Sequence, residues 1–214
     1  MRIAIAGGHG KIGQRLIRRL VERGDEIRSI DRNPDYADEL RAAGAKPVIC
    51  DLESATEEDV ASAVGSVDAI IFSAGAGPGS GPDRKWTMDY GGVVKLIEAA
   101  KANAVRRFLL VSSMGADPNA HGEDTFAVYL RAKGKADAEL QSSGLDYTIV
   151  RPTGLTDDPG TGLVELGDRV GSGRIPRDDV AAILVASLDA TNAIGKTFEA
   201  RSGNTPIEEA IASL

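Results

Sequence analysis

Apolar runs and amphipathic stretches alternate along most of the chain. Short runs rich in Ile, Val and Ala, such as 2–8 and 67–75, are typical of strands covered on both faces of a sheet. The stretch 11–24 places Ile12, Leu16 and Leu20 on one helical face and ends at Gly24. By the same criteria we expect further strands at 26–32, 45–52, 106–113 and 145–152, and further helices at 34–44, 54–65, 83–103 and 124–142. This alternation predicts the α/β fold class, with a parallel sheet and helices on both of its faces.

The pattern changes after Pro152. The segment that follows is rich in Gly and Asp, and beyond it we expect a helix at 177–190, a strand at 195–203 and a short final helix. This tail is too small for a hydrophobic core of its own. We therefore expect a single domain over residues 1–214, in which 153–214 form a small C-terminal extension at the mouth of a site. The Gly- and Pro-rich stretch 77–82 predicts a mobile loop.

Composition and charge narrow the classes of function. The net charge of −7 argues against nucleic acid as a partner, because phosphate binding needs a basic face. No apolar run approaches the roughly 18 residues of a membrane span, and the apolar N-terminal run is too short for a signal peptide. A cytoplasmic protein is therefore expected. A single cysteine, Cys50, and two histidines, His9 and His121, do not provide a metal-ligand cluster, so no metal is expected.

The segment between the first strand and the first helix carries a glycine pattern. Gly7, Gly10 and Gly13 follow the spacing G-x-x-G-x-x-G. Such glycines permit a tight turn, a close approach of the backbone to a phosphate, and close packing of the helix, whose N-terminus attracts a pyrophosphate. The alternative is a glycine-rich turn without a ligand. The pattern predicts that a dinucleotide contacts residues Gly7, Gly8, His9, Gly10, Lys11, Ile12 and Gly13.

Charged residues at the ends of the next two strands are candidates to contact the adenosine. Asp31 would accept hydrogen bonds from the ribose hydroxyls of NAD, whereas Arg32 would pair with the 2′-phosphate of NADP. The two signals conflict, so the cofactor class stays open. Asp51 would reach the adenine amino group, or else cap the helix that follows it. We expect Asn33 and Leu52 to line the same site.

Tyr129 and Lys133 lie four residues apart in the helix expected at 124–142. A phenol and an ammonium one turn apart share one face of a helix. Taken alone, the pair does not distinguish a catalytic site from a solvated helix face, where Arg131 and Lys135 would also lie.

Several motifs follow one another in a characteristic order: "AGGHGKIG", "DRNP", "CDL", "FSAG", "VSS", "YLRAK" and "YTIVRPTGL". This order resembles the atypical short-chain dehydrogenase/reductases, in particular the NAD(P)-binding group with biliverdin/flavin reductase-like and NmrA-like members. The similarity covers nearly the whole chain. It implies a Rossmann-type doubly wound parallel sheet and a nicotinamide cofactor, either NAD or NADP.

The resemblance also implies roles for the residues that match these motifs. Tyr129 would donate a proton, and Lys133 would hold the cofactor ribose and favour the phenolate. Ser113, or its neighbour Ser112, would hydrogen-bond a substrate carbonyl, although both also suit a strand-end cap. The nicotinamide half of the cofactor would contact two segments, Ser73, Ala74 and Gly75, and Arg151, Pro152, Thr153, Gly154 and Leu155.

Three hypotheses about function follow. The first is an NAD(P)H-dependent oxidoreductase that reduces a small carbonyl, quinone or flavin-like acceptor. The second is an NAD(P)-binding regulatory or redox-sensing protein without turnover, suggested by the Gly- and Pro-rich loop beside the site. The third is an isomerase or epimerase that retains NAD, which the small tail disfavours. The expected partner is a small-molecule substrate, and family analogy allows a homodimer.

Overall fold

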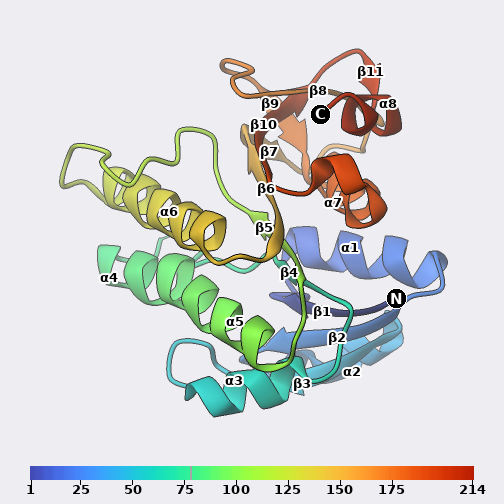
Figure 1. Cartoon of the computed structure of the whole chain (residues 1–214), viewed down its shortest axis with the longest axis vertical. Helices are drawn as coiled ribbons and strands as arrows, with labels where there is room; N and C mark the ends of the chain where they lie inside the picture. Colours follow the sequence, from blue (N-terminus) through green and yellow to red (C-terminus); the bar gives the residue numbers. More distant parts are fainter. Residues whose placement is uncertain (78) are drawn as a thin grey trace.

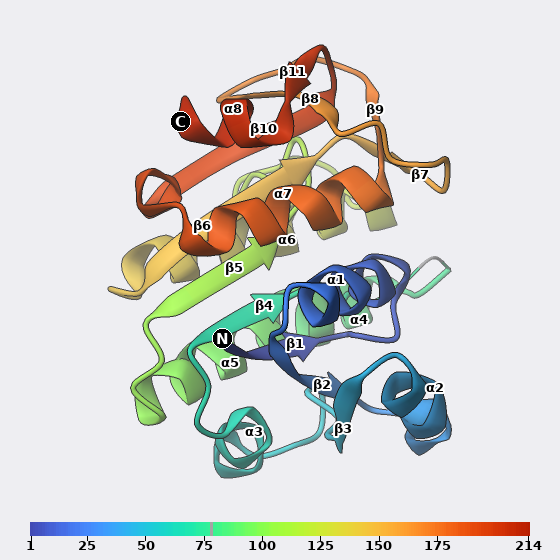
Figure 2. The same ribbon diagram turned by 90° about the vertical axis from the view of Figure 1, so that its right-hand side faces the viewer.

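A central sheet with helices on both faces forms the protein (Figure 1). The computed structural model describes residues 1–77 and 79–214. The main sheet has nine strands in the order β11-β8-β10-β6-β5-β4-β1-β2-β3, from top to bottom in Figure 2. These strands are, in chain order, β1 (Arg2–Ala6), β2 (Glu26–Asp31), β3 (Ala45–Ile49), β4 (Ala69–Phe72), β5 (Arg107–Val111), β6 (Asp146–Pro152), β8 (Leu163–Gly167), β10 (Lys196–Ser202) and β11 (Thr205–Pro206).

The seven strands from β3 to β10 in this order are parallel to their neighbours, and β8 runs antiparallel to β10 and β11. The α/β fold with a mostly parallel sheet is therefore confirmed. The chain turns outward in opposite directions from β1, since β2 and β3 lie on one side of it and β4 to β6 on the other. This reversal opens a crevice at the carboxyl ends of β1 and β4, where ligands bind in folds of this type.

The helices cover the two faces in separate layers (Figure 1). One layer contains α3 (Glu57–Val64), α5 (Gly91–Ala102) and α6 (Thr125–Ser142), and the other contains α1 (Lys11–Glu22), α2 (Ala37–Ala42), α7 (Arg177–Asp189) and α8 (Ile207–Ala212). Alternate residues of β1 supply the two cores: Ile3 and Ile5 pack with Leu16 of α1, and Ala4 and Ala6 pack on the side of α5. This period of two is what a strand buried on both faces requires.

Several element boundaries differ from the sequence prediction. The helix expected at 83–103 consists of α4 (Pro82–Arg84), a π-helical segment η2 (Lys85–Tyr90) and α5. The helix expected at 54–65 begins at Glu57, because Thr56 and Asp59 form a capping box there. The start of the helix expected at 34–44 is a 3₁₀ turn, η1 (Pro34–Tyr36). Of the loop predicted to be mobile at 77–82, Pro78 lies outside the described residues.

The segment after Pro152 contains strands that the sequence analysis missed. β8 and β11 join the main sheet, and β7 (Gly154–Thr156) pairs with β9 (Arg174–Pro176) in a small parallel sheet. A further 3₁₀ turn, η3 (Thr191–Ala193), precedes β10. These strands have only two to five residues each, too few for periodicity to reveal them. Within the described part of the chain, no helix is long and apolar enough to cross a membrane.

Candidate nucleotide and acceptor site

The glycine turn lies at the crevice between β1 and β4. Gly7 has a φ of +81°, and a Cβ there would come 2.7 Å from the Cα of Ala74, which follows β4. A Cβ on Gly13 would come 2.2 Å from the carbonyl oxygen of Gly7. Gly10 closes the turn by donating its N–H to that same carbonyl at 3.0 Å. The turn therefore needs glycine at positions 7 and 13 for its shape.

The N-terminus of α1 opens onto the same crevice. Its N-cap is Gly10, which offers no side-chain acceptor, and the first turn contains no acidic residue. The first backbone N–H groups of a helix lack intrahelical partners, and the helix dipole gives them a partial positive charge. A pyrophosphate fits such a site, and the absence of Cβ atoms from the glycines leaves space for it. These residues therefore fit a dinucleotide.

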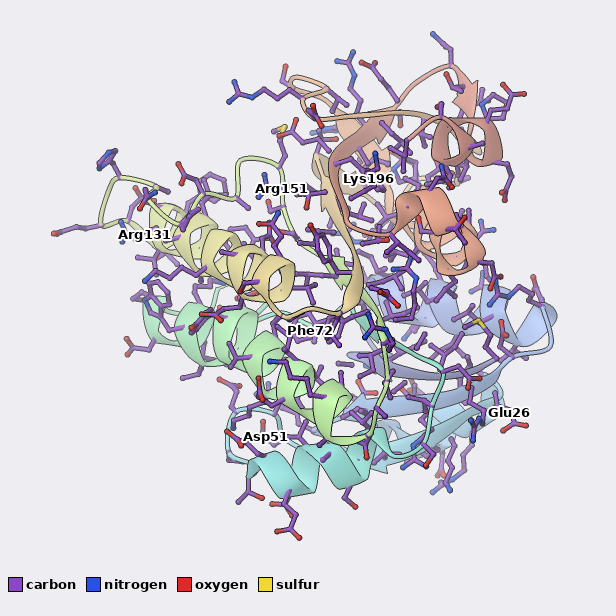
Figure 3. All side chains as sticks on the ribbon, in the orientation of Figure 1. Glu26, Asp51, Phe72, Arg131, Arg151 and Lys196 are labelled. Atoms are coloured by element: carbon purple, nitrogen blue, oxygen red, sulfur yellow. The ribbon has the colours of Figure 1, made fainter. Side chains whose placement is uncertain are left out.

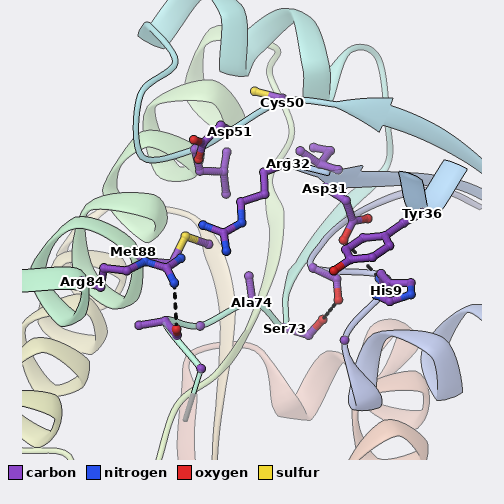
Figure 4. A pocket seen from close by; sticks show the side chains of 17 residues that line it. His9, Asp31, Arg32, Tyr36, Cys50, Asp51, Ser73, Ala74, Arg84 and Met88 are labelled. Atoms are coloured by element: carbon purple, nitrogen blue, oxygen red, sulfur yellow. Dashed lines mark hydrogen bonds between the residues drawn. The ribbon is translucent and has the colours of Figure 1, made fainter. Parts of the chain in front are cut away.

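Two cavities extend from this turn and share Gly10 and the segment 73–77. The first has a volume of about 310 Å³ and lies toward β2 and β3 (Figure 4). The second has a volume of about 760 Å³ and lies toward β5 and α6. Together they form one groove along the carboxyl ends of the strands. Its sequence-predicted lining residues are Gly7, His9, Gly10, Lys11, Ile12, Asp31, Arg32, Asp51, Leu52, Ser73, Ala74, Gly75, Ser112, Tyr129, Lys133 and Leu155.

The side chains of Asp31 and Arg32 differ in burial and in their hydrogen-bond partners. The Asp31 side chain is buried, and its two carboxylate oxygens accept the His9 backbone N–H at 3.1 Å and the Ser29 hydroxyl at 2.6 Å. The Arg32 side chain is 57% exposed and extends into the first cavity (Figure 4). Asp31 thus supports the glycine turn itself, while the Arg32 guanidinium is accessible to a ligand.

Glu53 lies between Arg32 and a second arginine, Arg84. The Glu53 carboxylate accepts a hydrogen bond from Arg84 Nη2 at 2.7 Å and lies 3.5 Å from Arg32 Nη1. The Arg84 guanidinium holds the pKa of Glu53 below its usual value. Arg84 also donates to the Ala76 carbonyl at 3.1 Å, so it joins the loop after β3 to the loop after β4.

The other residues predicted near the adenosine are only partly in the first cavity. Asp51 lines it and accepts hydrogen bonds from Glu53 N–H and the Ser54 hydroxyl, so it caps a turn rather than the helix, whose N-cap is Thr56. Leu52 is buried in the cavity wall. The Asn33 side chain caps η1 by accepting the Asp35 N–H, and Asn33 is not part of the lining.

Tyr129 and Lys133 both face the second cavity from α6. Lys133 is 3% exposed; its Nζ donates to the Val111 carbonyl at 2.8 Å and lies 4.0 Å from the Asp89 carboxylate. A lysine ammonium has three N–H donors, so donors remain for a ligand in the cavity. The two residues predicted from one helical turn are therefore brought together at the carboxyl ends of the strands.

The two serines predicted to contact a substrate lie in different surroundings. Ser112 is buried and lines the second cavity, where its hydroxyl donates to the Asp137 carboxylate at 2.9 Å. Ser113 donates to the carbonyl of Met114 at 3.2 Å and lies outside the lining of both cavities. The structure thus brings Ser112, rather than Ser113, to Tyr129 and Lys133.

Behind Ser112 lies Asp137, which was not predicted from the sequence. Its side chain is 1% exposed and accepts the Arg151 Nε–H at 2.9 Å, while its Oδ1 has no partner among the described residues. Burial raises the pKa of the Asp137 carboxyl, against the opposing effect of Arg151. Tyr129, Lys133 and Asp137 follow one another at intervals of four residues on α6, a spacing that could have indicated the third residue.

The segment 151–155 contributes less to the lining than predicted. Arg151 is engaged by Asp137, and Figure 3 shows that it lies well apart from Asp51. Pro152 and Thr153 are buried, and Thr153 bonds the carbonyl of Ala200. Gly154 begins β7, and Leu155 lines the second cavity. The lining of the two cavities is completed by residues that were not predicted, namely Ile30, Tyr36, Cys50, Ala76, Gly77, Arg84, Lys85, Met88, Asp89, Val111, Thr125, Phe126 and Arg177.

Comparison with known proteins agrees with this geometry. Residues 7–191 match a family model described as NAD(P)H-binding. The chain is 41% identical to a Bacillus subtilis (strain 168) protein described as the uncharacterized sugar epimerase YhfK, over 100% of both chains.

Two solved structures are also similar over most of their length. A putative NAD-dependent epimerase/dehydratase from Bacillus halodurans is 38% identical, with a TM-score of 0.91 and 100% of both chains covered. The anaerobillin reductase ChuY from Escherichia coli O157:H7 is 25% identical, with a TM-score of 0.80, covering 94% of this chain and 97% of that one. The chain therefore belongs to the NAD(P)H-binding family of Rossmann-type proteins that resemble atypical short-chain dehydrogenase/reductases.

Proposed function

We propose that this protein is an NAD(P)H-dependent oxidoreductase that reduces a small carbonyl, quinone or flavin-like acceptor. The observation that carries the proposal is the position of Tyr129, which faces a cavity continuous with the glycine turn. A proton donor thus lies within the same groove as the residues that fit a dinucleotide. Ser112 and Lys133 line the cavity beside it.

The reduction of a carbonyl requires a hydride and a proton. A reduced nicotinamide held in this groove would supply the hydride, that is, two electrons and a proton. Tyr129 donates its phenolic proton to the carbonyl oxygen, which completes the alcohol. Lys133 would use its remaining N–H donors to orient the cofactor ribose. Water then returns the proton to Tyr129.

For the cofactor class, we propose NADP. Both carboxylate oxygens of Asp31 already accept protein hydrogen bonds, whereas the exposed Arg32 guanidinium extends into the first cavity. Guanidinium groups bind phosphate through charge-assisted hydrogen bonds. The dissociation constants of NADPH, NADP, NADH and NAD, measured by titration with the fluorescence of Trp86, test this choice.

Replacement of Tyr129 by Phe tests the proposed reaction. With a carbonyl acceptor we expect turnover to fall by about 100-fold or more, because the general acid is lost, while the NADPH dissociation constant stays unchanged. Turnover of an acceptor that takes up hydride alone, such as a flavin, would be less affected. An unchanged rate with a carbonyl acceptor would contradict the role of Tyr129. Cofactor binding without reduction of any acceptor would favour the regulatory alternative.

An isomerase that retains its cofactor is the second candidate. It is favoured by the epimerase descriptions of the similar proteins from Bacillus subtilis and Bacillus halodurans. Such an enzyme takes a hydride from its substrate and returns it, so NAD would remain bound through purification and no reduced cofactor would be consumed. Extraction of the purified protein, followed by identification of any released nucleotide, distinguishes the two candidates.

A further inference from the structure

The second cavity carries positive charge in an acidic protein. The chain has a net charge of −7, yet the charged side chains that line this cavity are Lys11, Lys85, Lys133 and Arg177 against one carboxylate, Asp89. A cleft lined by one sign of charge concentrates ligands of the opposite sign. The contrast with the rest of the chain indicates that this part of the groove receives an anion.

Three of these four cations already have a carboxylate partner. Lys133 pairs with Asp89, and Lys11 and Arg177 both pair with Asp157. For Lys85, no carboxylate of the described residues lies within ion-pair distance. Its Nζ donates to the Gly77 carbonyl at 3.2 Å and to the Ser80 hydroxyl at 2.8 Å, which are both neutral groups.

Lys85 is also buried, with 8% of its surface exposed. A buried charge without a counter-ion is unfavourable, so such a group is normally paired. Among the described residues two of its three N–H donors are used, which leaves a third for a ligand. The Lys85 Nζ lies 5.6 Å from the centroid of the Tyr129 ring, so an anion bound there would lie beside the proposed proton donor.

The remainder of the cavity suits the apolar part of a small acceptor. Ile12 and Val111 line its inner wall, and Phe126 and Leu155 lie at its exposed side, with 64% and 38% of their surfaces exposed. Its volume of about 760 Å³ is within the usual range for a site that binds a small organic molecule.

We propose that Lys85 binds a carboxylate of the acceptor, so that the substrate is a small carbonyl compound that carries a carboxylate near its reducible group. This rests on the proposed function. The same cation could instead meet a phosphate of the cofactor, since both cavities share the glycine turn. Separate measurements of acceptor binding and of cofactor binding distinguish these two sources of negative charge.

The test compares benzoate with benzamide, a neutral probe of similar shape, by calorimetric titration of the protein saturated with oxidised cofactor. In the original protein we expect benzoate to bind at least about tenfold more tightly, the effect of a hydrogen bond to a charged group. Lys85→Met should abolish this preference, and Lys85→Arg should retain it. The matched control is Lys135→Met, because Lys135 lies 5.6 Å from the Trp86 ring but is exposed and outside the cavity.

Equal binding of the two probes by the original protein, or a preference that survives in Lys85→Met, would overturn the proposal. So would a tenfold loss of cofactor affinity in Lys85→Met with the benzoate preference intact, since Lys85 would then bind the cofactor. If Lys85→Met fails to fold, Lys85→Gln takes its place, because its amide still donates to the Gly77 carbonyl. If benzoate binds through Lys85 but no acceptor is reduced, the proposed reaction is contradicted. The assignment of Lys85 as an anion site would still hold in that case.

Discussion

The two ends of the groove are built in different ways. At the end that fits the adenosine and pyrophosphate, the glycine turn depends on backbone shape within residues 7–13 and on the end of β2, and Arg84 and Met88 reach the cavity from α4 and η2. At the other end, side chains converge from α6, η2, β5, β7 and α7, which are far apart in the sequence. The glycine turn is therefore specified locally, whereas the second cavity depends on the whole fold. Substitutions at the two ends should accordingly fail in different ways.

The largest effect is expected at the glycine turn, for Gly7→Ala. Its matched control is Gly24→Ala, because Gly24 has a similar φ of +88° but open space where an added methyl group would lie, whereas a methyl group on Gly7 would meet Ala74 at 2.7 Å. An alanine in the left-handed backbone conformation lowers the free energy of unfolding by about 1 kcal/mol. We expect Gly24→Ala to lose only this stability and to bind NADPH normally. Gly7→Ala should in addition lower NADPH affinity by roughly 100-fold or more, equivalent to about 2.8 kcal/mol of binding free energy.

Titration with NADPH and chemical denaturation of both variants provide the measurement. If Gly7→Ala binds NADPH as tightly as Gly24→Ala does, the close approach of Gly7 to Ala74 is not what shapes the nucleotide site. A loss of affinity in both variants would indicate a general effect of left-handed alanine instead.

The next effect concerns the class of cofactor. We expect Arg32→Ala to weaken NADPH binding by roughly 10- to 100-fold, the contribution of charge-assisted hydrogen bonds, and to leave NADH affinity unchanged. Arg41→Ala is the control, because Arg41 is also exposed and paired with an acid but lies outside the first cavity. An equal loss for both cofactors would place Arg32 against the adenine ring, and no loss for either would contradict the preference for NADP.

The glycine turn at the first end of the groove could be predicted from the sequence for a physical reason. The strand, the three glycines and the start of the helix follow one another in the chain. The whole motif of Gly7, Gly10 and Gly13 can therefore be recognised within one short stretch of sequence. The helices predicted at 83–103 and 124–142 contain Lys85, Asp89 and Asp137. Nothing in the neighbouring sequence distinguishes these three residues from charged residues on a surface. Their significance comes from burial and from contacts with the loops after β4 and β5 and with Arg151, which only the packed structure supplies.

Asp31 and Asp137 are both buried, but the hydrogen bonds of their carboxylates differ. Each carboxylate oxygen of Asp31 has a hydrogen-bond partner, whereas Asp137 has one unpartnered oxygen among the described residues and a pKa raised by burial above its ordinary value of 3.8. A carboxyl with a raised pKa binds more protons in the folded state than in the unfolded state, so its contribution to stability declines as pH rises from 3.8 through the folded value. Asparagine does not titrate. The stability of Asp137→Asn relative to the original protein should therefore improve as pH rises.

Asp146→Asn is the control with the opposite sign. Its hydrogen bond from Arg106 lowers the pKa of Asp146, so that carboxyl contributes stability above 3.8 that is lost as pH falls. The stability of Asp146→Asn relative to the original protein should thus worsen as pH rises. Denaturation of all three proteins between about pH 2 and pH 8 measures both slopes, because the window of Asp146 lies at and below its unfolded value of 3.8 and that of Asp137 lies above 3.8. Parallel slopes for the two variants would contradict the raised pKa of Asp137.

Substitution by alanine distinguishes the two serines, which the sequence could not separate because they are adjacent at the end of β5. Ser112→Ala removes a donor from a buried carboxylate, and hydrogen bonds to charged groups contribute about 1.5–3 kcal/mol. We expect a loss of that order in the free energy of unfolding, together with slower turnover. Ser113→Ala removes a contact outside both cavities, so its stability should change by less than about 0.5 kcal/mol and its turnover by less than about twofold.

Ser112 also has a restricted role in the cavity. Its single hydroxyl proton is donated to Asp137, so while that carboxylate is ionised the Ser112 oxygen can only accept a hydrogen bond from a ligand. Its partner would then be a hydroxyl, such as that of Tyr129 or of the alcohol product, rather than a carbonyl oxygen. Comparing kcat and KM of the two serine variants with one carbonyl acceptor tests this assignment. A larger loss of kcat in Ser113→Ala than in Ser112→Ala would mean that the loop after β5 rearranges when substrate binds, and that the serine predicted first from the motif is the one that acts.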